Sequence, residues 1–339
     1  MVPVIRELKA LGHDVVIGAV GRPLDFLRGT FPGLPFIKFP GLNILYPRKG
    51  SMTLKMALSA PGILFNIYKE HRKIDQLVQT YGFDAVISDN RFGLWTDKAK
   101  CIYVTHQLMV KTPWKSSFAE KILRKLNYFF INKYDHCWIP DLPGEPNLSG
   151  DLSHKYKPPS NAAYIGPLSR FAGEQKVAEK TEKKYRFICI VSGPEPQRTV
   201  FEDRMTSLLK DQPFKSAILR GIPGRREKSI SGSVELFSHL DDEEFKKVVS
   251  LSETIIARPG YSTLMDLAAL GRNAIVVPTP GQTEQEYLAS YHSKKGFFIP
   301  APQDGPRLEE LFKFSNKMEQ MPELFDLNLL QTNIKGFFT

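Results

Sequence analysis

Residues 253–292 alternate between strand-like and helix-like segments, and this alternation constrains the fold more than any other feature of the chain. An apolar run at 253–257 is typical of a buried strand, and a turn and a helix follow at 258–271. A second apolar strand at 273–278 leads into another helix that begins after residue 281. Because short strands and helices that alternate in this way build parallel sheets covered by helices, the sequence predicts an α/β fold.

The stretch RPGYSTLMDLAALG, at 258–271, carries the end signals of the first of these helices. Its Pro-Gly pair breaks the preceding strand, and Ser262 or Thr263 is a suitable cap for the helix that follows. Gly271 stands just past the helix, where glycine commonly ends helices in the left-handed conformation.

The composition is that of a globular protein with more than one domain. The chain has 339 residues, 42% of them hydrophobic and 24% charged, which is enough for two cores. Its three cysteines lie far apart, without a CxxC pair or clustered histidines, so we expect reduced thiols in the cytoplasm and no zinc site. The acidic cluster at 241–244 fits helix capping better than a metal site. We find no signal peptide and no apolar run of about 18 residues, so a membrane-spanning helix is not expected.

The net charge of +10 is concentrated in the first half of the chain. Residues 1–165 contain 22 Lys and Arg against 13 Asp and Glu, a net charge of +9, whereas the remainder contains 24 against 23, a net charge of +1. This asymmetry favours an anionic partner for the first half, either a membrane surface or a phosphorylated acceptor; a basic surface without a ligand is the alternative. Nucleic acid is not expected, because the charge is scattered and no nucleic-acid-binding motif occurs.

Two α/β units are predicted, and the first begins in an unusual way. A helix-like segment at 2–12 precedes the strand-like segment at 14–19, whereas an open α/β domain normally begins with a strand. We therefore expect that a first strand is missing from this sequence. The expected divisions are an N-terminal domain at 1–165, a linker at 166–184, a second α/β domain at 185–310 and a C-terminal helical tail at 311–339.

Common nucleotide-binding and hydrolytic motifs are absent from the sequence. No GxGxxG follows a strand, no GxxxxGK[ST] occurs, and the stretch GYSTL lacks the second glycine of a nucleophile elbow. Two strand–loop–helix junctions remain, at 192–199 and 258–266, and each presents backbone amides, hydroxyls and an arginine. Because helix N-termini bind phosphate through free amides and the helix dipole, two such junctions in one sheet can hold a diphosphate.

The second junction and the segment after it form a recognisable pattern. Arg258, Gly260, Thr263 and Asp266 are spaced as R-x-G-x-x-T-x-x-D, and an apolar strand ending in proline and a helix with Gln285 follow. With Asp in place of Glu and one Gln in place of two, this pattern resembles the donor half of family 28 glycosyltransferases. The resemblance implies the GT-B fold, in which two Rossmann-like α/β domains face a cleft.

The resemblance also implies which residues bind the donor. In the family the acidic residue holds the ribose hydroxyls of UDP, a role that falls to Asp266, whose structural alternative is helix capping. The Gln-Gln pair contacts sugar hydroxyls; here Gln285 matches and Glu286 departs. Arg198 either pairs with phosphate or is a solvated first-turn arginine. The expected substrate-binding residues are Ser192, Gly193, Arg198, Arg258, Gly260, Ser262, Thr263, Asp266, Gln282, Gln285 and Glu286.

The first half resembles the family more loosely. The stretch VTHQL at 104–108 is similar to the family's strand end H-E-Q-N beside the acceptor cleft, with His106 in register. The family's N-terminal glycine-rich loop, G-x-G-G-H, has no counterpart. His106 and Asp89, both at predicted strand ends, are the candidates for a catalytic base, and a structural hydrogen bond is the alternative for each. The resemblance implies an inverting transfer that needs neither a metal ion nor another cofactor.

The sequence therefore predicts a transferase that moves a hexosyl group, with N-acetylglucosamine as one option, from a UDP-sugar to a hydroxyl acceptor. The family's best-known member acts on a lipid-linked acceptor. The apolar and basic segment at 42–68 fits either a peripheral membrane contact or packing on its own domain. We expect a cytoplasmic protein, at the inner face of the membrane where the acceptor is lipid-linked. The alternative is a nucleotide-sugar-binding protein without transferase activity, or one subunit of a two-chain enzyme.

Overall fold

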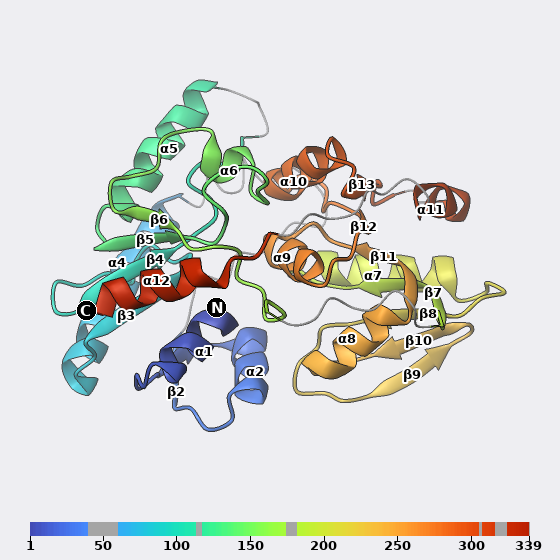
Figure 1. The fold of residues 1–339 in the computed structure, drawn as a ribbon, viewed down its shortest axis with the longest axis horizontal. Coiled ribbons are helices and arrows are strands. Elements are labelled where there is room, and N and C mark those ends of the chain that lie inside the picture. The colour runs from blue at the N-terminus through green and yellow to red at the C-terminus, as the bar shows by residue number, and fades with distance from the viewer. Residues whose placement is uncertain (40–59, 113–116, 174–181, 305–306, 316–323, 339) are drawn as a thin grey trace.

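The computed structural model describes residues 1–39, 60–112, 117–173, 182–304, 307–315 and 324–338. Their strands form three sheets (Figure 1). Two sheets lie within residues 1–173, which we call the N-terminal half, and the third lies within residues 182–315, the C-terminal half. The predicted α/β class, with parallel sheets, is confirmed.

The sheet of the C-terminal half has seven strands in the order β13-β12-β11-β7-β8-β10-β9. All neighbouring strands are parallel except β9 and β10. Strands β8 to β10 follow β7 toward one edge of the sheet, and β12 and β13 follow β11 toward the other edge. The direction in which strands are added therefore reverses between β7 and β11. Ligands of doubly wound sheets bind at the carboxyl ends of the strands at such a reversal. The strands are β7 (Tyr185–Ile190), β8 (Ser216–Leu219), β9 (Lys228–Ser231), β10 (Val234–Phe237), β11 (Ser252–Ala257), β12 (Ala274–Val276) and β13 (Phe298–Pro300).

Helices cover both faces of this sheet, because successive side chains of a strand point to opposite faces. Phe187 and Cys189 of β7 are buried in one core with Phe201 and Leu311, whereas Ile188 belongs to a larger core on the opposite face. The first core lies below α7 and α11, and the second includes residues of α8, α9 and α10. The helices are α7 (Gln197–Leu209), α8 (Asp242–Ser250), α9 (Tyr261–Ala269), α10 (Thr283–Ser293) and α11 (Leu308–Ser315).

The N-terminal half contains a two-stranded sheet, β1-β2, and a four-stranded sheet, β3-β4-β5-β6, both parallel. Within the described residues, β1 does not pair with β3. The strands are β1 (Ile17–Ala19), β2 (Phe36–Lys38), β3 (Ala85–Asp89), β4 (Lys100–Val104), β5 (His136–Ile139) and β6 (Ala162–Tyr164). The helices are α1 (Val2–Ala10), α2 (Gly21–Thr30), α4 (Ala60–Tyr81), α5 (Ser117–Ile131) and α6 (Asp151–His154).

The last helix, α12 (Leu327–Phe338), returns to the N-terminal half, where Figure 1 shows it beside the four-stranded sheet. Phe337 is buried and its ring contacts those of Trp138 and His136, while Gln331 donates a hydrogen bond to Glu7 of α1. The expected tail at 311–339 is therefore divided between the two halves. Figure 1 shows α11 far from α12, at the edge of the C-terminal half.

The ends of two helices test the predicted capping. Gly271 has a φ of 63°, as predicted for the residue after α9. The prediction that Ser262 or Thr263 caps α9 is wrong, because the N-cap is Gly260, which has no side chain to form a capping hydrogen bond. The acidic cluster does cap a helix: the Asp241 side chain accepts a hydrogen bond from the amide of Glu244 at the start of α8.

Candidate active site

A cavity of about 210 Å³ lies where the carboxyl ends of β3 and β4 meet the start of α9. Residues of both the N-terminal and the C-terminal half line it. Three predicted site residues line it, namely Asp89, His106 and Ser262. The other lining residues are Met1, Asn90, Val104, Thr105, Pro140, Leu168, Tyr261 and Met265.

The N-terminal turn of α9 supplies the part of this cavity that comes from the C-terminal half. The first amide of the helix with an acceptor in the chain is that of Leu264, which donates to the Gly260 carbonyl. Among the described residues, the amides of Tyr261, Ser262 and Thr263 have no acceptor. Free amides and the positive end of the helix dipole attract anions. The start of α9 is therefore suited to bind phosphate at the cavity.

His106 follows β4 and is held by residues of the opposite half. Its Nε2 lies 2.9 Å from Oε1 of Glu284 on α10, and its ring stacks on that of Tyr261 at 4.0 Å between centroids and 4° between planes. The Tyr261 hydroxyl in turn donates to the Pro140 carbonyl at 2.8 Å. The predicted base candidate is therefore restrained on its face and at one ring nitrogen.

Asn90 shapes the wall of the cavity beside Asp89. It has a φ of 54°, in the left-handed region that asparagine tolerates better than most residues. Its side-chain oxygen accepts hydrogen bonds from the hydroxyls of Tyr103 and Thr105, both at 3.1 Å. These bonds hold the turn after β3, so the exposed Asp89 has a fixed place at the cavity.

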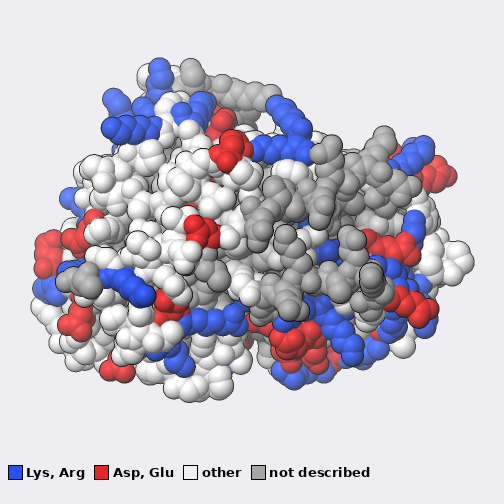
Figure 2. Space-filling model, in the orientation of Figure 1, with Lys and Arg blue, Asp and Glu red and all other residues white. Residues whose placement is uncertain are grey.

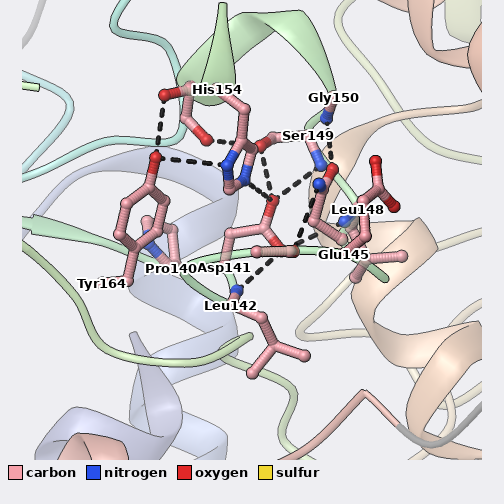
Figure 3. A network of polar contacts seen from close by, with 12 residues as sticks. Pro140, Asp141, Leu142, Glu145, Leu148, Ser149, Gly150, His154 and Tyr164 are labelled. Carbon is pink, nitrogen blue, oxygen red and sulfur yellow. Dashed lines mark hydrogen bonds and ion pairs between the residues drawn. The ribbon is translucent and has the colours of Figure 1, made fainter. Parts of the chain in front are cut away.

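A buried network fixes the loop that leads into α6, at residues 141–154 (Figure 3). Asp141 is fully buried and accepts hydrogen bonds from the amides of Leu142, Leu148 and Ser149. Burial alone would raise the pKa of Asp141, but the contact with His154 at 3.4 Å and hydrogen bonds from Ser149 and the backbone lower this pKa below its usual value. The network therefore orders the loop rather than supplying a reactive group.

This loop sets the position of α10. The Asp151 amide donates to the Tyr287 hydroxyl at 2.5 Å, and His292 bonds to the Leu148 carbonyl at 2.8 Å. Gly150 has a φ of 52°, and a Cβ there would lie 2.4 Å from the Tyr287 hydroxyl oxygen. Only glycine allows this close approach.

Arg258, predicted to bind substrate, is buried with 1% of its surface exposed. It donates to the Val277 carbonyl at 2.8 Å and to Gln303 at 2.6 Å, and its guanidinium lies 4.3 Å from the centre of the Phe201 ring. Burial lowers its pKa to about 10. Its hydrogen bonds are used within the chain, so a direct phosphate contact from Arg258 does not fit this structure. The residue instead ties the end of β11 to Val277, Gln303 and the first residue of α7.

Arg198 is also turned inward, so neither alternative predicted for it, phosphate pairing or a solvated arginine, describes its place here. It is 4% exposed and pairs with Glu202 at 3.0 Å. At the same helix end, Glu195 accepts hydrogen bonds from the amide and hydroxyl of Thr199 and pairs with Arg22 of α2 at 2.8 Å. The start of α7 is therefore occupied by a carboxylate of the chain itself.

Asp266 is engaged by the segment that joins the two halves. Its carboxylate accepts a hydrogen bond from the Ser169 hydroxyl at 2.7 Å and lies 3.4 Å from the Arg170 guanidinium. Burial raises the pKa of Asp266, an effect that Arg170 and Ser169 oppose. The carboxylate thus already accepts the kind of hydrogen bonds that two ribose hydroxyls would donate.

The predicted sugar-contacting residues close the loop before α10. Gln285 accepts a hydrogen bond from the Thr279 amide and Glu286 from the Gly281 amide, both at 2.8 Å, and Gln282 is the N-cap residue. Ser192 and Gly193 lie in the loop between β7 and α7, where Gly193 has a φ of 99° and open space around it. None of these side chains lines the cavity.

Comparison with known proteins identifies the second half of the chain. Residues 232–327 match the glycosyltransferase family 28 C-terminal domain. The chain is a family 28-like glycosyltransferase. An uncharacterized glycosyltransferase of Methanosarcina mazei is 23% identical over 316 residues, which cover 86% of this chain and 79% of that protein. One from Methanopyrus kandleri is 21% identical over 317 residues, covering 88% and 86%.

The transferase also shares its fold with solved glycosyltransferases. The spinosyn rhamnosyltransferase SpnG has a TM-score of 0.61 at 13% identity, with 100% of this chain and 96% of that chain covered. SnogD from Streptomyces nogalater has a TM-score of 0.60 at 14% identity, with 99% and 94% covered. These similarities show that the transferase has the GT-B fold.

Sequence reasoning missed two residues of the cavity region of the transferase. Asn90 directly follows Asp89, and an asparagine at a strand end is a signal for a left-handed turn. Glu284 stands beside Gln285 in the helix that the family pattern includes, but its partner is 178 residues away. Only the folded arrangement of the two halves brings Glu284 to His106.

Proposed function

We propose that the transferase moves a hexosyl group from a UDP-sugar to a hydroxyl acceptor with inversion, the donor binding to the C-terminal half and the acceptor to the N-terminal half. One observation carries the proposal: an uncapped helix N-terminus and a histidine at a strand end line the same cavity, at the meeting of the two halves. The helix end suits a leaving diphosphate, and the histidine suits a base.

The donor is held at the carboxyl ends of β7 and β11. The free amides of α9, with Ser262, bind the diphosphate, and the loop of Ser192 and Gly193 approaches it from β7. Asp266 accepts the ribose hydroxyls in place of Ser169. A nucleoside diphosphate donor agrees with the structural neighbour SpnG, solved in complex with thymidine diphosphate, which has a TM-score of 0.56 at 13% identity.

The reaction follows from this arrangement. His106 removes the proton of the acceptor hydroxyl as its oxygen attacks the anomeric carbon, on the face opposite the diphosphate. The bond from that carbon to the phosphate oxygen breaks, and UDP leaves with the electron pair. Asp89 is placed to orient the acceptor, and the α9 amides stabilise the charge on the leaving group.

The acceptor is proposed to be lipid-linked, with the protein peripheral to the membrane. Residues 42–59 of the segment predicted to contact the membrane lie outside the described residues. On α5, however, an apolar row is 46–72% exposed, and the exposed Lys121 and Lys125 lie between its members. Figure 2 shows Lys and Arg gathered above this helix. The row consists of Phe118, Ile122, Leu126 and Phe129. Within the described residues, no helix has the length and hydropathy to cross a bilayer.

Vesicle flotation tests the membrane proposal. We expect binding to anionic vesicles at low salt, and Lys121→Glu with Lys125→Glu should weaken it at least about 10-fold, since each basic residue near an anionic surface contributes about 1 kcal/mol. Lys210→Glu with Lys215→Glu, the same charge change in the C-terminal half, is the control and should leave binding unchanged. Equal binding by both double variants would favour a soluble acceptor.

Turnover is tested by release of UDP from UDP-glucose, UDP-galactose and UDP-N-acetylglucosamine, with water or vesicle lipids as acceptor. We expect one donor to be cleaved, and His106→Gln to lower kcat by about 10²- to 10⁴-fold, the usual contribution of a general base. Among the described residues no three His, Cys, Asp or Glu side chains are grouped as metal ligands, so EDTA should not change the rate. Tight UDP binding without turnover of any donor would favour the alternative, a binding subunit.

A further inference from the structure

The two contacts on His106 determine which of its ring nitrogens can act as a base. Nε2 lies 2.9 Å from a carboxylate oxygen of Glu284. An ionised carboxylate accepts hydrogen bonds but cannot donate them, so Nε2 carries a proton, and in the neutral ring Nδ1 then keeps its lone pair. No hydrogen bond within the chain engages Nδ1 of His106 in the described residues.

The orientation of the His106 ring is fixed, as is the nitrogen that carries its proton. The Tyr261 ring lies parallel to that of His106 at 4.0 Å, and its hydroxyl is anchored on the Pro140 carbonyl. The side chains of His106 and Glu284 are 17% and 24% exposed, so the pair is largely shielded from water. In such surroundings a charge-assisted hydrogen bond is stronger than one at the surface.

Glu284 is itself held in place by contacts on both sides. The neighbouring Thr283 hydroxyl donates to the Lys111 carbonyl at 2.9 Å, which anchors the start of α10 to the chain just after His106. One turn later, the Tyr287 hydroxyl accepts the Asp151 amide of the buried loop. The Glu284 carboxylate therefore meets His106 through a docked helix and not through a free surface side chain.

We propose that Glu284 is a positioning residue that orients His106 and keeps its proton on Nε2, so that Nδ1 takes the proton of the acceptor hydroxyl. This inference rests on the proposed role of His106. A carboxylate that orients a histidine base in this way is the arrangement of hydrolytic triads. Because Glu284 belongs to the donor half and His106 to the acceptor half, the base is complete only when the two halves are arranged as they are here.

Nuclear magnetic resonance of ¹⁵N-histidine-labelled protein tests the pair without any ligand. We expect one slowly exchanging, downfield-shifted Nε2–H proton, assigned to His106 by its loss in His106→Gln. Glu284→Gln and Glu284→Ala should abolish this signal, and Glu284→Asp should restore part of it. The control Glu243→Gln changes an exposed carboxylate of α8 and should leave the Nε2–H signal unchanged. A wild-type spectrum without such a proton, or its persistence in Glu284→Ala, would overturn the inference.

Measurements of kcat and KM then test whether Glu284 positions His106 during turnover. With UDP-N-acetylglucosamine as donor probe and water as acceptor, Glu284→Gln should lower kcat by about 10- to 100-fold, less than the 10²- to 10⁴-fold loss of the base itself, with KM changed less than about threefold. A kcat of Glu284→Gln within twofold of wild type, with His106→Gln inactive, would contradict the positioning role. If His106→Gln keeps full kcat while the Nε2–H signal behaves as expected, the pair stands and the proposed base is wrong.

Discussion

The starts of α7 and α9 occupy equivalent places in the fold but present opposite chemistry. Each helix follows a central parallel strand, β7 or β11, on either side of the point where the strand order reverses. At α9 the amides of the first three residues have no acceptor in the described part of the chain, and Tyr261 and Ser262 line a cavity. At α7 the Glu195 carboxylate accepts the amide of Thr199 and pairs with Arg22 of the N-terminal half.

The difference shows that topology selects where a ligand can bind, whereas a few local residues decide whether the place is available. Gly260 precedes α9 and has no side chain to offer its amides, while Glu195 stands two residues before α7 and supplies an anion. The charge on Glu195 is stabilised there: burial would raise its pKa, but Arg22 and Thr199 lower it to about 2. We infer that α9, and not α7, meets the charge of the diphosphate.

The difference between the two helix starts is tested most directly by giving the start of α9 a carboxylate, as at α7. Ser262→Glu places a carboxylate on the exposed second residue of α9. Two charges 4 Å apart near a protein surface interact by about 4 kcal/mol, so UDP affinity measured by calorimetry should fall by about 1000-fold. The melting temperature should not fall, because an anion in the first turn of a helix is favourable by about 0.3–1 kcal/mol.

Two variants control for this result. Ser262→Ala removes the hydroxyl without adding charge and should weaken UDP binding less than about 10-fold. Ser207→Glu adds the same charge on an exposed position of α7, far along the helix, and should have no effect. UDP binding by Ser262→Glu at wild-type strength would show that the diphosphate does not meet α9.

Replacement of Asp266 is expected to give the second largest loss of UDP affinity. Loss of two ribose hydrogen bonds to a charged acceptor should cost about 2–4 kcal/mol of UDP binding in Asp266→Ala. Because Arg170 bridges Asp266 and Asp242, the matched control is Asp242→Ala, which removes another partner of Arg170 but no proposed ribose contact. Equal losses in both variants would assign the effect to the Arg170 network and not to the ribose.

The sequence predicted the α/β class, the GT-B fold and the two junctions, because these depend on local periodicity and on a motif within one segment. Asp89, His106 and Ser262, three of the predicted site residues, line one cavity in the structure, and their roles there stay predictions. The sequence did not predict that Arg198 and Arg258 would be buried, since an arginine before a helix has the same sequence pattern whether it faces a phosphate or the core.

The sequence could not predict the contacts between the two halves, for a different reason. The pairing of Glu284 with His106 and of Glu195 with Arg22 depends on how two sheets are arranged relative to each other. Periodicity contains no information about that arrangement. The position of α12 on the N-terminal half is missed for the same reason, because its apolar face fits any uncovered core.

Glu195→Gln removes the negative charge from the start of α7, as at α9, and should change UDP affinity less than the variants of Ser262 and Asp266. Removing the anion should strengthen UDP binding by about threefold, equivalent to about 0.7 kcal/mol, because Arg22 already neutralises part of the charge. Arg22→Gln removes the closer of the two arginines that pair with Glu195 and leaves Arg198 at 3.5 Å, so it should shift UDP affinity in the opposite direction. If neither variant changes the affinity, the start of α7 does not face the diphosphate.

The smallest expected effect is on stability, and its pH dependence identifies the carboxylate. The folded pKa of Glu195 is about 2, below the ordinary value of 4.5, so its contacts stabilise the folded protein above about pH 5 and the contribution is lost as the pH falls toward 2. Since this ion pair is half exposed and worth about 0.2–1 kcal/mol, Glu195→Gln should lower the melting temperature at pH 7 by about 1–3 °C. The gap should shrink at pH 3, because there the carboxylate is protonated in the unfolded chain, where its pKa is 4.5, while it is still mostly ionised in the folded protein. In Ser262→Glu the sign is reversed: the new carboxylate at α9 should raise the melting temperature at pH 7 and lose that advantage at pH 3. A gap for Glu195→Gln that is equal at both pH values would mean that the charge of Glu195 does not hold the start of α7.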